Sequence, residues 1–243
     1  MLSDDEVERI LVVVAHPDDV DFGAAGTVAG WTGSGIEVTY CLVTAGDAGG
    51  FDPAVPRGAI AGIRRAEQEA AAAAVGVGDV RFLGHPDGRV TPSIELRRDI
   101  ARVIRQVRPQ RVVTQSPVRN LDRVFASHPD HLAVGEATLD AVYPDARNPF
   151  AHPELAAEGL DAHAVAEVWL MGGGGAEQGG SEVAIDVTDR LAAKLAALRC
   201  HASQMVEIDD LEKMIRSWLG AVAAGAGLGE GRLAEGFRVV ATG

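Results

Sequence analysis

The chain has 243 residues, of which 47% are hydrophobic, and its 35 acidic residues outnumber 22 lysines and arginines to give a formal net charge of −13 at pH 7. This composition is typical of a soluble globular protein with a sizeable core. The negative charge argues against nucleic acid or anionic membranes as partners, because both are bound by neutralising phosphates. The opening MLSDDEVERI is acidic, unlike a signal peptide, and no apolar run is long enough to cross a bilayer. We therefore expect a cytoplasmic protein without membrane insertion.

Short apolar runs alternate with amphipathic stretches through the first half of the chain. The predicted strands are Ile10–Val14, Glu37–Thr44, Val80–Leu83 and Arg111–Gln115, and the predicted helices are Ala24–Gly33, Ala59–Val75 and Ile94–Val107. Strands that alternate with helices in this way build a parallel sheet. The expected fold class is therefore α/β, a Rossmann-like, mostly parallel sheet with helices on both faces.

The second half of the chain is less regular. We expect a helix near Ser127–Pro129, strands near Val165–Leu170, Glu182–Val187 and Phe237–Ala241, and helices near Asp189–Ala202 and Asp209–Ala223. Residues 1–243 are then a single domain, with a Rossmann-like core over about residues 8–145 and a C-terminal part over about 146–243 that completes the fold. The glycine-rich stretch Gly172–Gly180 has two interpretations that stay open, a lid over a site or an ordinary surface loop.

A histidine and several acids directly follow the first predicted strand. The run AHPDD contains a first tetrad, His16-Pro17-Asp18-Asp19, which places one histidine and two acids within four positions. Crowded carboxylates repel one another unless a cation or a solvated surface relieves them. Because ligands collect beyond the carboxyl ends of the strands in an open parallel sheet, this position favours a binding site over a surface turn.

A second tetrad, His128-Pro129-Asp130-His131, follows the fourth predicted strand and begins a helix, where proline is well tolerated. Together His16, Asp19 and His131 offer two imidazoles and one carboxylate. This donor set suits Zn²⁺ and leaves a fourth position for water. The sequence therefore predicts a catalytic metal site that joins the two tetrads.

The remaining polar residues of the tetrads suit proton transfer. Asp18 could take a proton from an attacking water as a general base. His128 could donate a hydrogen bond or a proton to the carbonyl under attack, with Asp130 orienting its ring. These three residues are the predicted catalytic and supporting groups.

Three other stretches can be interpreted as structural features without a functional role. The run His85-Pro86-Asp87-Gly88 is interpreted as a turn, because Asp-Gly closes turns readily. Arg64, three residues before Glu67 on a predicted helix, is either half of a surface pair or a residue that binds the substrate. His201 and Ser203, at the end of a later helix, are expected to serve capping and packing.

These residues resemble the signatures of the LmbE/PIG-L family of zinc-dependent N-deacetylases, over most of the chain. AHPDD is similar to the first family signature, HPDH to the second, RRAEQEAAAAAVGV to the Arg-x-x-Glu helix, and KLAALRCHASQ to the late helix that ends in His-x-Ser-Gln. The resemblance implies a Rossmann-like sheet and one Zn²⁺ per chain, with other divalent metals left open, and assembly into trimers or hexamers. It also implies a set of site residues: ligands His16, Asp19 and His131, general base Asp18, His128 facing the tetrahedral intermediate, and Arg64 at the substrate.

Three functional hypotheses follow. The first is a metal-dependent hydrolase that removes an acyl group, expected to be acetyl, from the amino group of a glucosamine-containing small molecule. The second is an amidase for a thiol conjugate or a glycopeptide-type secondary metabolite, with the same metal and a different pocket. The third, a non-catalytic sugar- or nucleotide-binding protein, is disfavoured because the turn after the first strand lacks G-x-G-x-x-G. The run Val20–Gly23 differs from the mycothiol branch of the family and is more similar to bacillithiol-type relatives.

Overall fold

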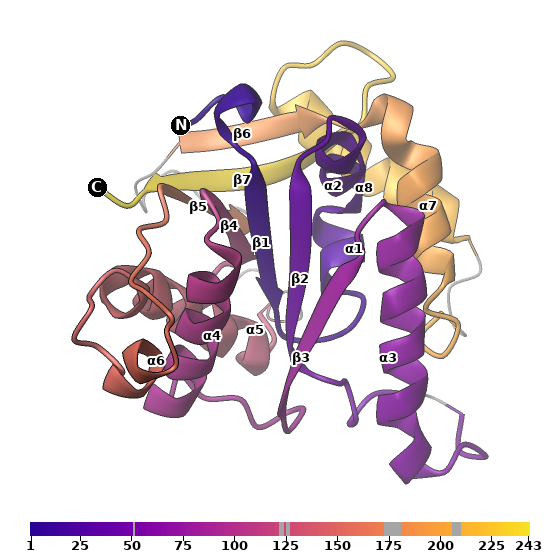
Figure 1. The fold of residues 1–243 in the computed structure, drawn as a ribbon. Coiled ribbons are helices and arrows are strands. Elements are labelled where there is room, and N and C mark those ends of the chain that lie inside the picture. Colours follow the sequence, from indigo (N-terminus) through magenta and orange to yellow (C-terminus); the bar gives the residue numbers. More distant parts are fainter. Residues whose placement is uncertain (51, 122–123, 125–126, 173–180, 206–209) are drawn as a thin grey trace.

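The structure is a computed structural model that describes the chain except residues 51, 122–123, 125–126, 173–180 and 206–209 (Figure 1). The strands are β1 (Arg9–Val14), β2 (Glu37–Thr44), β3 (Asp79–His85), β4 (Arg111–Gln115), β5 (Glu167–Met171), β6 (Ser181–Asp186) and β7 (Ala234–Ala241). The helices are α1 (Asp19–Gly23), α2 (Ala25–Gly33), α3 (Arg57–Ala74), α4 (Ile94–Val107), α5 (Pro129–Asp140), α6 (Pro153–Ala157), α7 (Leu191–Arg199) and α8 (Leu211–Gly225). Short helical turns cover Asp4–Glu6, Ala141–Ala146 and Thr188–Arg190.

The described strands form one seven-stranded sheet in the order β3-β2-β1-β4-β5-β7-β6. The five strands from β3 to β5 are parallel to their neighbours. Strand β7 runs antiparallel to both β5 and β6, so the last part of the chain extends the sheet that the first part begins. The predicted α/β class with a mostly parallel sheet is confirmed.

Strand β1 lies inside the sheet and is buried on both faces. Its side chains alternate: Ile10, Val12 and Val14 join a hydrophobic cluster with α2, α3 and α7, whereas Leu11 and Val13 join a second cluster with α4 and α5. All five are 0% exposed. Burial on both faces explains why the strand reads as a continuous apolar run instead of an alternating one. Each such side chain stabilises the fold by about 1.5–3 kcal/mol.

The topology brings the two predicted tetrads to one edge of the sheet. Strands β1 and β4 are parallel neighbours, with Val13 opposite Thr114, so their carboxyl ends lie side by side. His16 follows β1 after one residue, and α5, which carries the second tetrad, follows β4 after a loop. Residues more than a hundred positions apart are therefore placed together by strand pairing.

A buried ion pair ties the C-terminal part to the beginning of the chain. Lys194 Nζ donates to Glu235 Oε1 (2.7 Å) and to the carbonyl of Asp21 (2.9 Å), and both charged side chains are almost fully buried. Glu235 also accepts the backbone N–H groups of Gly26 (3.0 Å) and Thr27 (2.7 Å). A carboxylate from the last strand therefore caps the first turn of α2, whose N–H groups have no partner inside the helix.

Two predicted features differ from the structure or lie outside it. Helix α1, a single turn with Asp18 as its N-cap, was not predicted, because five residues are too few to show a helical period. Beyond residue 172, the stretch Gly172–Gly180 lies outside the described residues. Among the described helices, none combines the length and apolar character needed to span a membrane.

Candidate functional site

The three predicted metal ligands meet at the carboxyl edge of the sheet. His16 Nδ1 lies 3.2 Å from His131 Nε2 and 3.4 Å from Asp19 Oδ2, and His131 Nε2 lies 3.0 Å from Asp19 Oδ1. His16 sits in the loop after β1, Asp19 begins α1, and His131 is in the first turn of α5. The two imidazole nitrogens therefore face each other, and the Asp19 carboxylate turns one oxygen toward each of them.

This arrangement fits a tetrahedral metal ion. Zinc binds imidazole nitrogens and carboxylate oxygens at about 2.0–2.2 Å, so neighbouring ligand atoms on a tetrahedron are about 3.3–3.6 Å apart. The separations here are 3.0 to 3.4 Å, close to that spacing, with a different Asp19 oxygen facing each imidazole. Burial opposes ionisation of Asp19, but the charges and hydrogen bonds of His131 and His16 outweigh it and lower the pKa of its carboxyl. Its ionised form is the one that binds a cation.

The other nitrogen of His16 faces two further carboxylates. His16 Nε2 lies 3.0 Å from Asp87 Oδ1 and 3.2 Å from Asp130 Oδ2. Burial lowers the pKa of His16, but hydrogen bonds to Asp19 and Asp87 outweigh burial and raise it to about 10. In metalloproteins, a ligand histidine usually donates its second N–H to a carboxylate, which fixes the ring and its tautomer. Asp87 and Asp130 are placed to do this for His16.

Asp87 was predicted to be part of a turn and not a residue of the site. The predicted turn at Asp87 and Gly88 is present, but the Asp87 side chain is only 7% exposed and points to His16. Its Oδ2 also accepts the N–H of Ala48 (3.0 Å). The available signal was that this turn follows β3, a third strand whose carboxyl end lies at the same edge.

The Asp130 side chain was expected to orient the ring of His128, but in the described part of the chain its hydrogen bonds go to other groups. Its carboxylate accepts the N–H groups of Gly88 (2.7 Å) and Val90 (3.2 Å) and contacts His16. The backbone N–H of Asp130 instead donates to His128 Nδ1 (3.2 Å). In a neutral imidazole this places the hydrogen on Nε2, where it can be donated outward. Partial burial and the charges of the two neighbouring histidines lower the pKa of His128, which favours that neutral form.

Asp18 lies beside the ligand cluster with its carboxylate held by an arginine. Arg64 Nη2 donates to Asp18 Oδ2 (3.1 Å), and the Asp18 side chain is 18% exposed. Burial and the charge of Asp19 raise the pKa of Asp18 to about 7, against the opposing charge of Arg64. A carboxyl group with a pKa near neutrality suits general-base chemistry.

Arg64 is not half of a surface pair with Glu67. It is 4% exposed, and besides Asp18 its guanidinium donates to the carbonyls of Pro17 (2.6 Å) and Gly46 (3.2 Å). Gly46 has φ of 67°, and a Cβ there would collide with the Arg64 guanidinium, so this turn requires glycine. Glu67 instead accepts from the backbone N–H and the hydroxyl of Ser203 (both 2.7 Å). Substrate binding by Arg64 stays a prediction.

A buried network of polar side chains behind Asp18 was not predicted from the sequence. Gln68 Oε1 accepts the N–H of Asp18 (2.9 Å), and Gln68 Nε2 donates to Asp21 Oδ2 (3.0 Å). His201 Nε2 meets the same oxygen of Asp21 at 2.8 Å, which is a more specific contact than the capping and packing expected of it. The signal for Gln68 was its position on the buried stripe of α3, four residues after Arg64.

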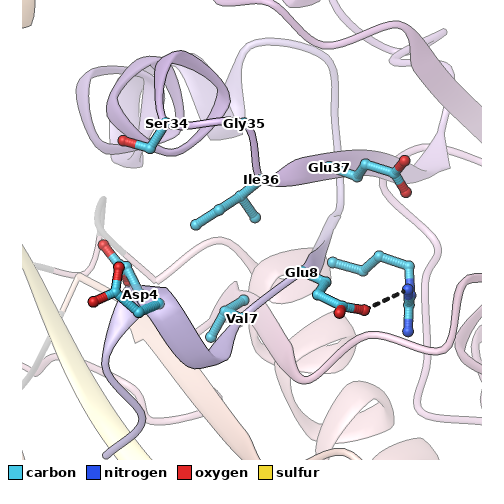
Figure 2. Close-up of a pocket in the computed structure, with 9 residues that line it drawn as sticks. Asp4, Val7, Glu8, Ser34, Gly35, Ile36 and Glu37 are labelled. Atoms are coloured by element: carbon cyan, nitrogen blue, oxygen red, sulfur yellow. Dashed lines mark hydrogen bonds and ion pairs between the residues drawn. The ribbon is translucent and has the colours of Figure 1, made fainter.

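A cavity of about 450 Å³ lies at the opposite, amino-terminal edge of the sheet (Figure 2). Residues before and at the starts of β1 and β2 line it, including Asp4, Glu8 and Glu37. Glu8 pairs with Arg9 at 3.1 Å, shown dashed in Figure 2. The cavity contains none of the predicted site residues, so the chemistry is assigned to the carboxyl edge.

Comparison with known proteins identifies the family. The family model described as GlcNAc-PI de-N-acetylase (PIG-L) matches residues 11–142. The diacetylchitobiose deacetylase of Thermococcus kodakarensis is 32% identical over 236 residues, covering 97% of this chain and 84% of that protein. The 1D-myo-inositol 2-acetamido-2-deoxy-alpha-D-glucopyranoside deacetylase of Actinosynnema mirum is 32% identical over 238 residues, covering 83% and 82% respectively.

A solved structure is similar throughout the chain. N,N'-diacetylchitobiose deacetylase from Pyrococcus horikoshii superposes with a TM-score of 0.86 at 27% identity, over 98% of this chain and 85% of that one. The matched family region contains both tetrads, Arg64 and Gln68. The resemblance inferred from the motifs is thereby confirmed, and the chain belongs to the PIG-L (GlcNAc-PI de-N-acetylase) family.

Proposed function

We propose that this protein is a zinc-dependent hydrolase that removes the N-acetyl group from a glucosamine-containing small molecule. The observation that carries the proposal is the convergence of His16, Asp19 and His131 beside Asp18: the two imidazole nitrogens lie 3.2 Å apart, and each lies within 3.4 Å of an oxygen of the Asp19 carboxylate. The named relatives are deacetylases of N-acetylglucosaminyl compounds, which supports the same reaction class here. Membership of this family also disfavours the non-catalytic alternative.

His16, Asp19 and His131 would hold the metal, and Asp87 and Asp130 would fix the His16 ring from its other nitrogen. A zinc ion at this point would supply Lewis acidity, which makes an amide carbonyl more electrophilic and lowers the pKa of an attacking water. The set of three protein ligands is typical of catalytic zinc sites, whereas structural sites use four.

Asp18 is the proposed general base. Its Oδ2 is held by Arg64, so Oδ1 is the atom assigned to the proton of the attacking water. As the oxygen of water bonds to the acetyl carbon, Asp18 takes that proton. When the carbon–nitrogen bond breaks, Asp18 returns the proton to the leaving nitrogen. The products are acetate and the free amino sugar.

His128 is the proposed donor to the negative charge that develops on the carbonyl oxygen. Because its Nδ1 accepts from the backbone of Asp130, its Nε2–H is available and its ring orientation is fixed. A preorganised donor of this kind stabilises the tetrahedral transition state without the reorganisation that water would need.

The test is an assay of purified protein for release of free amine, with and without added zinc. The panel varies the two halves of the substrate separately: N-acetylglucosamine linked to a second sugar, to inositol or to malate, and acetyl replaced by longer acyl groups. We expect zinc-dependent release from at least one acetylated glucosaminide. Activity confined to a glycopeptide or a thiol conjugate would favour the amidase alternative, and turnover that does not respond to metal would overturn the proposal.

A further inference from the structure

The backbone of Asp18 is held in an unusual conformation. Asp18 has φ of 87° and ψ of −24°, in the left-handed region that favours glycine. A non-glycine residue there is strained and persists only where its surroundings hold it. The direction of the Asp18 side chain depends on this backbone turn, so the contacts that hold the turn also aim the carboxylate.

Two side chains of α3 hold Asp18 from one face of that helix. Arg64 and Gln68 are four residues apart, hence one turn above the other, and both are buried. Arg64 contacts the carboxylate of Asp18 (3.1 Å), whereas Gln68 Oε1 accepts its backbone N–H (2.9 Å). The side chain and the main chain of the proposed base are thus held by separate residues.

The amide of Gln68 is itself fixed from behind. Its Nε2 donates to Asp21 Oδ2 (3.0 Å), and since the backbone N–H of Asp18 can only donate, the amide oxygen is the atom that faces Asp18. His201 Nε2 lies 2.8 Å from the same oxygen, and both His201 and Asp21 are 0% exposed. The direction of Gln68 therefore follows from a buried pair that joins α1 to the end of α7.

We propose that Gln68 is a positioning residue of the reaction: by accepting the N–H of Asp18 it holds the left-handed turn that aims the Asp18 carboxylate at water, and Asp21 with His201 fixes the Gln68 amide for this task. The inference rests on the proposed function, in which Asp18 is the base. In the described part of the chain, the hydrogen bonds of the Gln68 amide go to the backbone of Asp18 and to Asp21, and not to the proposed metal ligands. If Gln68 served packing alone, its loss would lower stability without a selective effect on turnover.

The experiment compares Gln68→Met with Gln110→Met. Methionine is similar in size to glutamine but lacks its amide. Gln110 is the matched control, because its Oε1 also accepts a backbone N–H, that of Arg9 (2.9 Å), but at the other edge of the sheet. For Gln68→Met we expect kcat to fall by about 10- to 100-fold, the size of effect that a misplaced catalytic group produces. KM and the zinc bound per chain should stay at wild-type values, and Gln110→Met should keep the wild-type kcat.

A second measurement reports the backbone directly. In metal-free, ¹⁵N-labelled protein, the amide proton of Asp18 should exchange with solvent faster in Gln68→Met than in wild type or Gln110→Met. Gln68→Asn, which keeps the amide but shortens its reach, is the milder variant if Gln68→Met does not fold, and should show the same two effects. Unchanged exchange at Asp18, or a kcat equal to that of Gln110→Met, would overturn the inference.

Failure of the inference and failure of the proposed function give different results. Asp18→Asn is assayed in parallel, since it removes the base and leaves the backbone N–H in place. If Asp18→Asn keeps wild-type turnover, the role of Asp18 as base is wrong, and the positioning role falls with it. If Asp18→Asn is impaired and Gln68→Met is not, the base assignment stands and the inference about Gln68 alone is wrong.

Discussion

Both edges of the sheet gather carboxylates, but among the described residues only those at the carboxyl edge are buried against imidazoles. At the carboxyl edge, the side chains of Asp19 and Asp87 are 9% and 7% exposed, and both contact His16. At the amino edge, the side chains of Asp4 and Glu8 are 55% and 76% exposed, and each meets an arginine. A count of acids along the sequence gives no basis for choosing between these edges.

This difference in burial and in partners distinguishes a candidate metal site from an ordinary acidic surface. An exposed carboxylate beside a guanidinium is screened by solvent and is already satisfied, and such pairs contribute little. A buried carboxylate and an imidazole can bind a metal together: the carboxylate offers an oxygen, and the imidazole offers a nitrogen lone pair once the ring loses its proton. Mutations at the two edges should therefore have very different consequences.

The largest effect is expected from His131→Ala, which removes one of three donors at the carboxyl edge. Two protein ligands do not hold zinc in a catalytic site, so we expect loss of stoichiometric zinc and of measurable turnover together. Elemental analysis and the amine-release assay check this. His163→Ala is the control. In the described part of the chain, the hydrogen bond found for His163 Nε2 goes to the carbonyl of Pro109, away from the proposed ligands. Wild-type zinc content in His131→Ala would show that the ligand set is wrong.

Asp18→Asn should have the next largest effect. General-base catalysis contributes about 10²–10⁴-fold, so kcat should fall by that range. Zinc content should not change, because Asp18 is not among the proposed ligands. The matched change at the amino edge is Asp4→Asn, which should leave kcat intact. Loss of zinc from Asp18→Asn would contradict the division between ligand and base.

Asp87→Asn should weaken the site without destroying it. The amide can still accept the N–H of Ala48, but it no longer offers a charged acceptor to His16 Nε2. Loss of a carboxylate that orients a ligand histidine lowers metal affinity by about 10- to 100-fold. Zinc competition with a chelator measures the affinity, and turnover at saturating zinc should remain close to wild type. An unchanged affinity would mean that Asp130 alone orients His16.

The smallest effect is expected from Glu8→Gln combined with Glu37→Gln at the amino edge. Exposed substitutions of this kind change the free energy of unfolding by about 0.5 kcal/mol or less. Urea unfolding should therefore be nearly unchanged, and so should zinc content and turnover. A marked loss of turnover would show that the two edges are coupled and that the comparison between them is too simple.

Much of the fold, and the meeting of the residues proposed as ligands, could be predicted from the sequence. Continuous apolar runs such as Ile10–Val14 indicate strands buried on both faces, and parallel strands share one carboxyl edge. That rule is enough to bring His16 and His131 together. Applied to β3 as well, it would have placed Asp87 at the same edge.

The remaining parts of the site depend on side-chain directions that local patterns do not encode. Whether the carboxylate of Asp130 turns toward His128 or His16 depends on N–H groups of the loop at residues 88–90. Gln68 and His201 occupy positions where apolar residues would be expected, and their partner, Asp21, becomes close only after α1, α3 and α7 pack. A buried polar residue can be assigned to the site only when its hydrogen-bond partner is known.

The cap that Glu235 provides to α2 has a consequence for how the molecule is made. Glu235 accepts the N–H groups of Gly26 and Thr27 in α2 and leaves the ribosome about two hundred positions after these two residues do. Lys194, which pairs with Glu235, also emerges late. Until β7 docks, a growing chain has α1 and α2 already synthesised but lacks the ion pair that holds them. We therefore expect the first turn of α2 to be secured only after β7 has been synthesised and has docked, because its cap is a contact between distant parts of the chain.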